Sequence, residues 1–130
     1  MLGKAIKTIL LSENLITGII GDRLFPVSDI EATLPAVYYS VKVNPEYTKN
    51  GPAMKNWDLT LITMHLNYDS AWYLALALKE TLDNARGKTN IGIKFERVQC
   101  ISITDEYEMN IDSFGQVLEF EIITSNIASS

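Results

Sequence analysis

One uninterrupted passage from a strand into a helix, between Trp57 and Gly87, constrains this chain more than any other part of its sequence. The segment NWDLTLITMHLN predicts the strand and DSAWYLALALKETLDNARG predicts the helix, because apolar side chains recur at strand spacing in the first and at helical spacing in the second. The apolar segments on either side are then expected to pair with this strand or to pack against this helix.

Within the predicted strand, the apolar positions change phase between Leu61 and Ile62. They have odd numbers before that point and even numbers after it. On a sheet with one buried face, such a change would send half of the apolar side chains into solvent, unless a β-bulge re-aims the strand or both faces are covered. We expect a bulge, in a strand that becomes buried on both sides.

The predicted helix runs from Ser70 to Arg86. Asp69 or Ser70 is expected to cap its start, and Gly87 to close its end. Trp72, Tyr73 and Leu76 widen its apolar surface beyond a single stripe, so we expect it to contact more than one element. Its core stripe is expected to consist of Ala71, Leu74, Ala75, Leu78, Leu82 and Ala85.

The N-terminal part of the chain has a helical pattern. Apolar residues at helical spacing from Leu2 to Leu11 predict an amphipathic helix. A second short helical turn follows, with Ser12 to Asn14 at its start and Gly21 as its stop. The segment GDRLFP, from Gly21 to Pro26, is expected to turn the chain.

Alternating apolar residues predict further β-structure at residues 36–43, 91–103 and 114–123. In the second of these segments the phase changes near Arg97, which indicates a bend or bulge. The polar segment from Asn44 to Ala53 is too long for a tight hairpin.

Together these patterns predict one α+β domain over residues 1–130, with a tail that frays from about residue 125. A mainly antiparallel sheet of about four strands is expected to pack against two helices, one N-terminal and one from Ser70 to Arg86.

Composition narrows the classes of partner and compartment. The 130 residues carry a formal net charge of -5, whereas binding to a phosphate backbone needs a clustered surplus of Lys and Arg. Specific nucleic-acid binding is therefore not expected. No apolar run approaches the roughly 20 residues of a membrane-spanning helix, and polar residues, including Lys7, interrupt what would be the apolar region of a signal peptide. We expect a protein that folds in the cytoplasm and contacts no membrane.

The residue types that carry most enzyme chemistry are sparse. Cys100 is the single cysteine, and its apolar neighbours favour a small buried hydrophobic residue over a reactive thiol. His65 is the single histidine and is interpreted as a structural or interfacial polar group. The segment GKTN, at residues 87–90, lacks the preceding glycine of a phosphate loop and follows a helix. We predict no catalytic residue, no metal ligand and no cofactor.

An acidic connection from Asp105 to Asp112 has three possible interpretations. Its side chains could offer oxygen ligands to calcium, although the spacing misses that of an EF-hand loop. They could form a solvated acidic loop, which we favour over the calcium site. They could also repel something. The carboxylates concerned are Asp105, Glu106, Glu108 and Asp112.

Taken together, the chain resembles the tail-completion or tail-terminator proteins of long-tailed bacteriophages, in the minor tail protein U group. The resemblance covers nearly the whole chain as a layout of strands and short turns. It is carried by IIGDRLFP, LPAVYYSV, PEYT, WDLTLITMHLNYDSAWYLALALKETLD, VQCISITDEYE and GQVLEFEI.

This resemblance implies a structural virion protein rather than an enzyme. Such proteins form a ring, commonly a hexamer, that caps the head-proximal end of the tail tube, stops its polymerisation and joins tail to head. The implied partners are other copies of the chain, the tail tube protein and a head-side connector protein. The implied location is the virion tail, after assembly in the host cytoplasm.

Two hypotheses about surfaces follow from the implied ring. DNA would pass through it without specific binding, so Asp105, Glu106, Glu108 and Asp112 are candidates for the wall of the channel, where carboxylates repel phosphates. A polar loop is the candidate contact with the tube or the adjoining subunit, and it comprises Asn44, Pro45, Glu46, Tyr47, Thr48, Lys49 and Asn50.

Two other functions stay open. The chain could be a different head-tail connector or neck protein of similar size. It could also be a small-ligand-binding domain or an enzyme, in which case a concave polar site with perturbed ionisable groups is expected.

Overall fold

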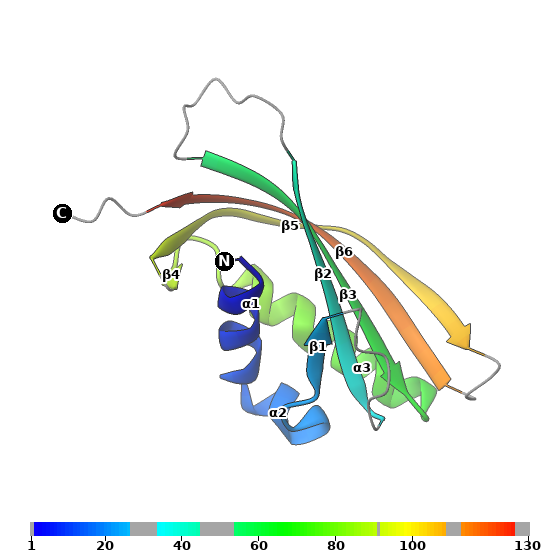
Figure 1. Cartoon of the computed structure of the whole chain (residues 1–130). Coiled ribbons are helices and arrows are strands. Elements are labelled where there is room, and N and C mark those ends of the chain that lie inside the picture. Colours follow the sequence, from blue (N-terminus) through cyan, green and yellow to red (C-terminus); the bar gives the residue numbers. More distant parts are fainter. Residues whose placement is uncertain (1, 27–33, 45–53, 91, 109–112, 127–130) are drawn as a thin grey trace.

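The computed structural model describes residues 2–26, 34–44, 54–90, 92–108 and 113–126. It has an α+β fold, as predicted, in which one sheet carries helices on one side (Figure 1). The helices are α1 (Leu2–Leu11), α2 (Asn14–Ile20) and α3 (Tyr68–Asp83). The strands are β1 (Leu24–Pro26), β2 (Ala36–Asn44), β3 (Met54–His65), β4 (Thr89–Asn90), β5 (Ile93–Glu108) and β6 (Ser113–Asn126).

Within the described residues, the sheet has six strands in the order β1-β2-β3-β6-β5-β4, rather than the four that were predicted. The two additional strands, β1 and β4, are three and two residues long. Neither is long enough to show an alternating pattern. Strand β1 pairs with β2, which begins ten residues further on, whereas β4 pairs with the start of the next strand, β5. The segment expected to turn the chain therefore contains β1, which pairs in parallel with β2, while every other pairing is antiparallel.

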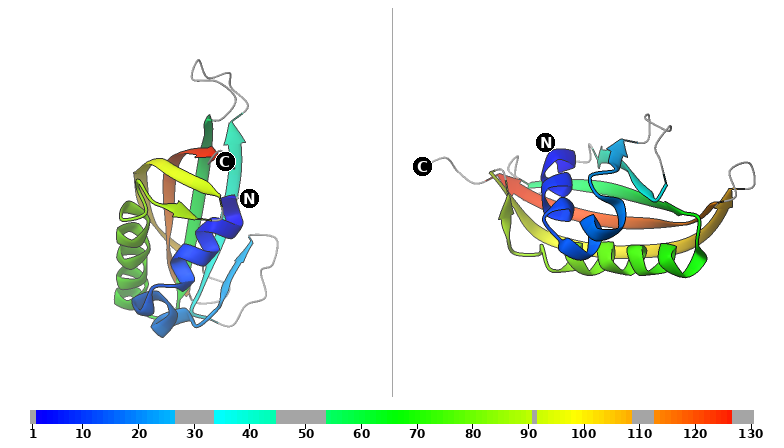
Figure 2. Two further views of the ribbon diagram at one scale, coloured as in Figure 1. Left: turned by 90° about the vertical axis from the view of Figure 1, so that its left-hand side faces the viewer. Right: turned by 90° about the horizontal axis from the view of Figure 1, so that it is seen from below.

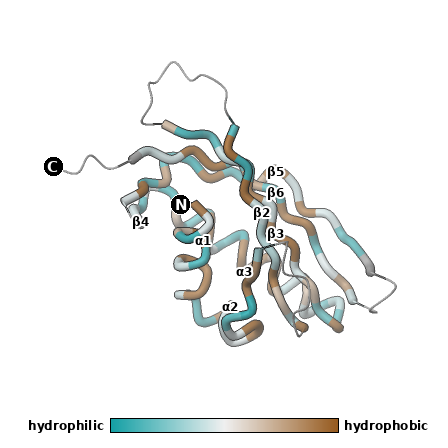
Figure 3. The backbone as a smooth tube through the Cα atoms, in the orientation of Figure 1, coloured by the Kyte–Doolittle hydropathy of each residue, from teal (hydrophilic) through white to brown (hydrophobic). Residues whose placement is uncertain are grey.

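All three helices cover the same face of the sheet (Figure 2). Helix α3 contacts the central strands β3 and β6 and also β5, while α1 contacts β2 and α3. The predicted core stripe of α3 is confirmed, since each of its six residues is at most 3% exposed. Figure 3 shows hydrophobic residues recurring along these helices and along the long strands. The core thus lies between one helical layer and one face of the sheet.

The predicted bulge in β3 is wrong. Strand β3 pairs without a register shift with β2 on one side and with β6 on the other. Leu59 and Leu61 are buried against the helices, whereas Ile62 and Met64 are half-buried on the opposite face. The change of apolar phase therefore reflects a straight strand that carries apolar side chains on both faces, because successive residues point to opposite sides.

The predicted irregularity near Arg97 is confirmed. The pairing of β5 with β6 shifts between Phe95 and Arg97, and again between Cys100 and Ser102. Each shift moves the odd and even positions of β5 to opposite faces. As a result Phe95, Val98, Cys100 and Ile103 all pack against the core although their numbers differ in parity.

The ends of α3 differ from the prediction. Asn67 is its N-cap, because the Asn67 side-chain oxygen accepts a hydrogen bond from the Ser70 N–H at 2.9 Å. At the other end α3 stops at Asp83. Gly87 lies beyond the helix with a φ of 81°, and its N–H donates to the Phe95 carbonyl at 2.7 Å. Gly87 therefore shapes the connection from α3 to β4, where a left-handed conformation suits glycine.

The N-terminal predictions are confirmed. Helix α1 has the predicted bounds, and Glu13 separates it from α2 as the cap of the second helix. Gly21 follows α2 with a φ of 62°, and its N–H donates to the Thr17 carbonyl. The buried residues Leu2, Ile6 and Leu10 hold α1 on the core.

Candidate functional site

The acidic segment forms the end of a strand rather than a loop. Asp105, Glu106 and Glu108 belong to β5 and pair with residues at the start of β6. Asp112 lies outside the described residues. Because a strand alternates its side chains, Asp105 and Glu106 point to opposite faces of the sheet. The segment from Asp105 to Glu108 therefore does not present a single acidic surface.

Asp105 takes part in a network at the point where α3 begins. One of its carboxylate oxygens accepts a hydrogen bond from the Tyr68 hydroxyl at 2.9 Å, and the other accepts from the Gln116 amide at 3.4 Å. The Tyr68 ring also packs edge-on against Phe114, with 5.7 Å between the ring centroids. These contacts tie the first turn of α3 to β5 and β6.

The buried part of this network is fully paired. The Thr63 hydroxyl donates to the Gln116 side-chain oxygen at 2.7 Å and accepts from the Gln116 backbone N–H at 2.9 Å. Both side chains are completely buried. A satisfied buried pair of this kind fixes strand register. We therefore assign Thr63, Gln116 and Asp105 a structural role, although Glu106 is exposed and remains a candidate for the channel wall.

The candidate contact loop lies mostly outside the described residues. Asn44 is the last residue of β2 and is paired with Asn56 of β3, whereas the positions from Pro45 to Asn50 are not described. The loop therefore joins two antiparallel strands at one end of the sheet.

His65 ends β3 and shapes the connection to α3. Its Nδ1 accepts a hydrogen bond from the Asn67 N–H at 3.0 Å, and burial lowers its pKa below the usual value. Within the described residues, no three His, Cys, Asp or Glu side chains gather closely enough to hold a metal ion. The contact that His65 makes is that of a structural residue.

Cys100 is half-buried on the helix-facing side of β5 and packs against the core. Burial raises the pKa of its thiol. A raised pKa keeps the thiol protonated at neutral pH, which lowers its nucleophilic reactivity. The structure thus places Cys100 as a small hydrophobic residue.

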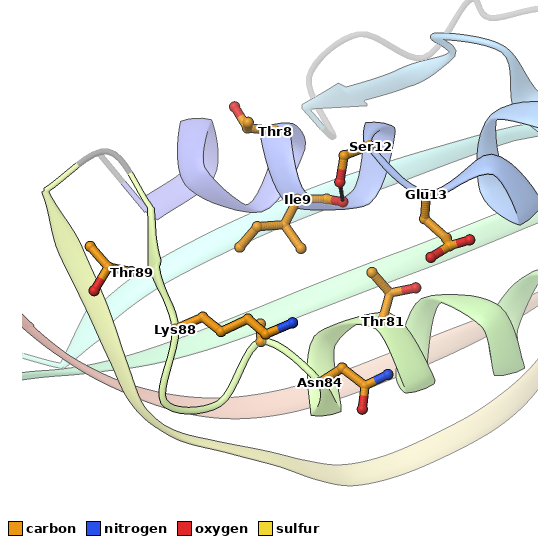
Figure 4. Close-up of a pocket in the computed structure, with 9 residues that line it drawn as sticks. Thr8, Ile9, Ser12, Glu13, Thr81, Asn84, Lys88 and Thr89 are labelled. Atoms are coloured by element: carbon orange, nitrogen blue, oxygen red, sulfur yellow. Dashed lines mark hydrogen bonds between the residues drawn. The ribbon is translucent and has the colours of Figure 1, made fainter.

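One concave polar pocket lies between the C-terminal ends of α1 and α3, with a volume of about 360 Å³ (Figure 4). Its side-chain hydroxyls are largely used by the helices themselves. Thr8 donates to the Lys4 carbonyl, Ser12 to the Ile9 carbonyl and Thr81 to the Ala77 carbonyl. The Glu13 carboxylate accepts from the Leu15 N–H as the cap of α2. Thr8, Ser12 and Thr81 thus use their hydroxyl protons within their own helices, and Glu13 uses one carboxylate oxygen as a helix cap.

The face of the sheet opposite the helices carries a second hollow, of about 520 Å³. The alternating pattern predicted polar side chains here, but it did not reveal that carboxylates from neighbouring strands gather. Asp58 and Glu121 are direct partners across β3 and β6, and Glu119 lies two positions from Glu121 on the same face. Lys42 of β2 pairs in register with Asp58 and lines the same hollow. This face is therefore predominantly acidic around one exposed apolar residue, Ile101, which is 55% exposed.

The outer side of α3 carries exposed apolar side chains. Tyr73 is 72% and Leu76 is 51% exposed. The sequence indicated that both residues widened the apolar surface of this helix, and the structure leaves them uncovered. None of the three described helices is long and apolar enough to cross a membrane. Tyr73 and Leu76 are three residues apart, so they are neighbours on one face of the helix and together present an apolar surface.

The fold was compared with known proteins. It is similar to a chain in a solved structure described as the virion of a native gene transfer agent (GTA) particle. The TM-score is 0.77, and the match covers 96% of this chain and 95% of the other. The two sequences are 15% identical, so the likeness is one of fold. The sequence matches no family model and no curated protein.

Proposed function

We propose that this chain is a structural protein of a phage-like virion that caps the head-proximal end of a long tail tube. In this role it assembles as a ring of six copies, which is common among the tail-terminator proteins that it resembles. The ring stops polymerisation of the tube and joins the tail to the head-side connector. The chain would assemble in the host cytoplasm and remain in the virion tail.

The observation that carries this proposal is the likeness of fold to a chain of the GTA virion over nearly the full length of both chains. Two features of the molecule support it. The hydroxyl groups of Thr8, Ser12 and Thr81 in the concave pocket donate to carbonyls of their own helices, which leaves fewer donors for a ligand. The outer side of α3 presents apolar side chains without a partner among the described residues, which suits a protein that functions in an assembly.

The ring assigns a place to two surfaces. The loop from Asn44 to Asn50, which follows β2 in the sequence, would contact the tube or the adjoining subunit. Of the four candidate carboxylates, Glu106 would approach the channel. Asp105, Glu108 and Asp112 lie near it in the sequence. Carboxylates there would repel the phosphates of passing DNA, so that the DNA does not adhere to the wall.

The proposal is tested by mixing the purified protein with tail tubes that lack a cap and with heads that lack a tail. We expect the protein to bind one end of each tube, to stop further addition of tube subunits and to make the tubes competent to join heads. Electron cryomicroscopy of the capped tubes would then locate the two surfaces. Binding to heads alone would contradict tube capping. A ring with all four carboxylates on its outer rim would contradict the channel assignment.

A different head-tail connector or neck protein is the second candidate. The same observation favours it, because the structure that resembles this chain is described as a whole virion and not by a tail component. The head-binding arm of the experiment separates the two functions, since a connector binds tail-less heads without tubes.

A further inference from the structure

The exposed line of α3 has the composition of a contact surface. Asp69, Tyr73, Leu76 and Glu80 follow one another at intervals of four, three and four residues, which places them on one face of the helix. This face is opposite the buried stripe. Tyr73 and Leu76 therefore form an apolar centre with a carboxylate at either end, about 16 Å apart along the axis at 1.5 Å per residue. We call these four residues the α3 ridge.

The outer face of α1 has the opposite charge. A shallow hollow of about 470 Å³ is lined by Lys4, Lys7, Thr8, Leu11 and Ser12, which we call the α1 groove. The methylene stems of the lysines and the Leu11 side chain make its walls largely apolar, while the ammonium groups stand at the rim. Among the described residues, neither lysine has a carboxylate within ion-pair distance.

The two surfaces are complementary in three respects. The ridge has projecting apolar side chains and the groove has an apolar hollow. The ridge ends in carboxylates and the groove is rimmed by ammonium groups. The ridge spans about 16 Å and the groove, from Lys4 to Ser12, about 12 Å along the helix axis at 1.5 Å per residue, so the two surfaces are of similar length. Charge complementarity of this kind orients two surfaces and disfavours wrong partners.

We propose that the α3 ridge of one copy of this chain docks on the α1 groove of another. This inference rests on the proposed function, because a ring requires two different surfaces of the same chain to meet. The contact buries Tyr73 and Leu76, which are 72% and 51% exposed in the single chain, and places Lys4 and Lys7, which are about one helical turn apart, beside the carboxylate at one end of the ridge. Lys79 and Asp83 already form an ion pair with each other at 2.7 Å, and they stay at the margin.

The test is the association constant of the purified full-length chain, measured by sedimentation over a range of concentrations. Two charge-reversed proteins are prepared, one carrying Lys4→Glu with Lys7→Glu and the other Asp69→Lys with Glu80→Lys. Each alone is expected to associate at least about tenfold more weakly than the unaltered chain, as for loss of a central contact. An equimolar mixture of the two is expected to recover association, because reversed grooves then meet reversed ridges and the other halves pair as before.

Controls separate this contact from general effects of charge and hydrophobicity. Lys42→Glu with Lys55→Glu alters net charge equally on exposed strand positions and is expected to associate as the unaltered chain does. Tyr73→Ser with Leu76→Ser is expected to weaken association, whereas Leu15→Ser is not, although Leu15 is 68% exposed. Circular dichroism establishes that every variant is folded.

Three results would overturn the inference. The unaltered chain could remain a monomer at its highest soluble concentration, the reversed proteins could associate normally, or their mixture could fail to recover. Tube capping is scored separately. Intact capping by a non-associating ridge variant would overturn this contact and leave the proposed function standing. Normal ridge-dependent association in a protein that does not bind tubes would support this contact and contradict the proposed function.

Discussion

At the scale of single residues, Gly115 is required by the close approach of a neighbouring backbone. A Cβ at this position would lie 2.1 Å from the Thr63 carbonyl oxygen. Gly115→Ala is therefore expected to push β3 and β6 apart beside the buried Thr63 and Gln116 pair, at a cost of about 2 kcal/mol in the free energy of unfolding. Urea unfolding measures the difference.

Gly18 provides the matched control for this substitution. It lies within α2, and a Cβ there would meet no atom within 4 Å. Gly18→Ala is expected to raise stability by up to about 1 kcal/mol, because alanine favours the helix over glycine. Equal effects of the two substitutions would contradict the close approach at Gly115.

His65 gives the fold a dependence on pH. Its Nδ1 accepts the Asn67 N–H, which only the neutral ring can do, and burial lowers its pKa. Between the lowered pKa and the usual value near 6.5, the unfolded chain holds a proton that the folded chain does not, so stability rises with pH in this window. Stability is therefore expected to fall as the pH drops from about 7.5 to about 5.5.

The variant His65→Asn isolates this contribution. An asparagine side chain can accept a hydrogen bond from a backbone N–H two residues on, and it does not titrate. Over the same pH range, the His65→Asn variant is expected to lose less stability than the unaltered chain. Thermal unfolding measures both losses. Equal losses would mean that other groups cause the whole effect.

At the scale of elements, the start of α3 is set by a residue outside its apolar pattern. Asn67→Ala removes the acceptor for the Ser70 N–H and is expected to cost about 1 kcal/mol of stability, measured by urea unfolding. Ser70→Ala keeps that N–H and serves as control, with an expected change below about 0.5 kcal/mol. A larger loss of stability for Ser70→Ala than for Asn67→Ala would mean that Ser70, and not Asn67, caps the helix.

Long amphipathic elements could be predicted from the sequence. Short strands, and which strands pair with each other, could not. The stripe from Ala71 to Ala85 was predictable because helical spacing alone determines which side chains are buried. Strand β1 was not, because three residues have no readable period and its partner, β2, lies ten residues further along the chain. The segment from Asp105 to Glu108 was predicted to be a connection because it is highly charged. The sequence alone did not indicate that it pairs with β6.

The candidate surfaces were partly predictable for the same reason. Tyr73 and Leu76 stood out as apolar residues beyond the core stripe of one helix. The gathering of Asp58, Glu119 and Glu121 on one face could not be read from sequence, since it depends on which strands are neighbours and in what register. Local periodicity indicates which face of an element a residue occupies, but not what stands beside it.

At the scale of the whole molecule, the sheet has two unlike faces. One is covered by all three helices, and the other carries no helix among the described residues (Figure 2). The ridge and the groove both belong to the helical layer, whereas the acidic hollow lies on the opposite face. In the proposed contact, copies of the chain meet through their helical layers. The acidic face of the sheet then stays uncovered.

The position of β6 also determines when the molecule can be completed. This last strand lies between β3 and β5, so no backbone pairing joins the β1-β2-β3 part of the sheet to the β5-β4 part without it. During synthesis, the sheet therefore stays in two pieces until residues 113–126 have left the ribosome. A chain truncated before residue 113 lacks the middle of its sheet, so the helical layer can close on a complete core only when residues 113–126 are present.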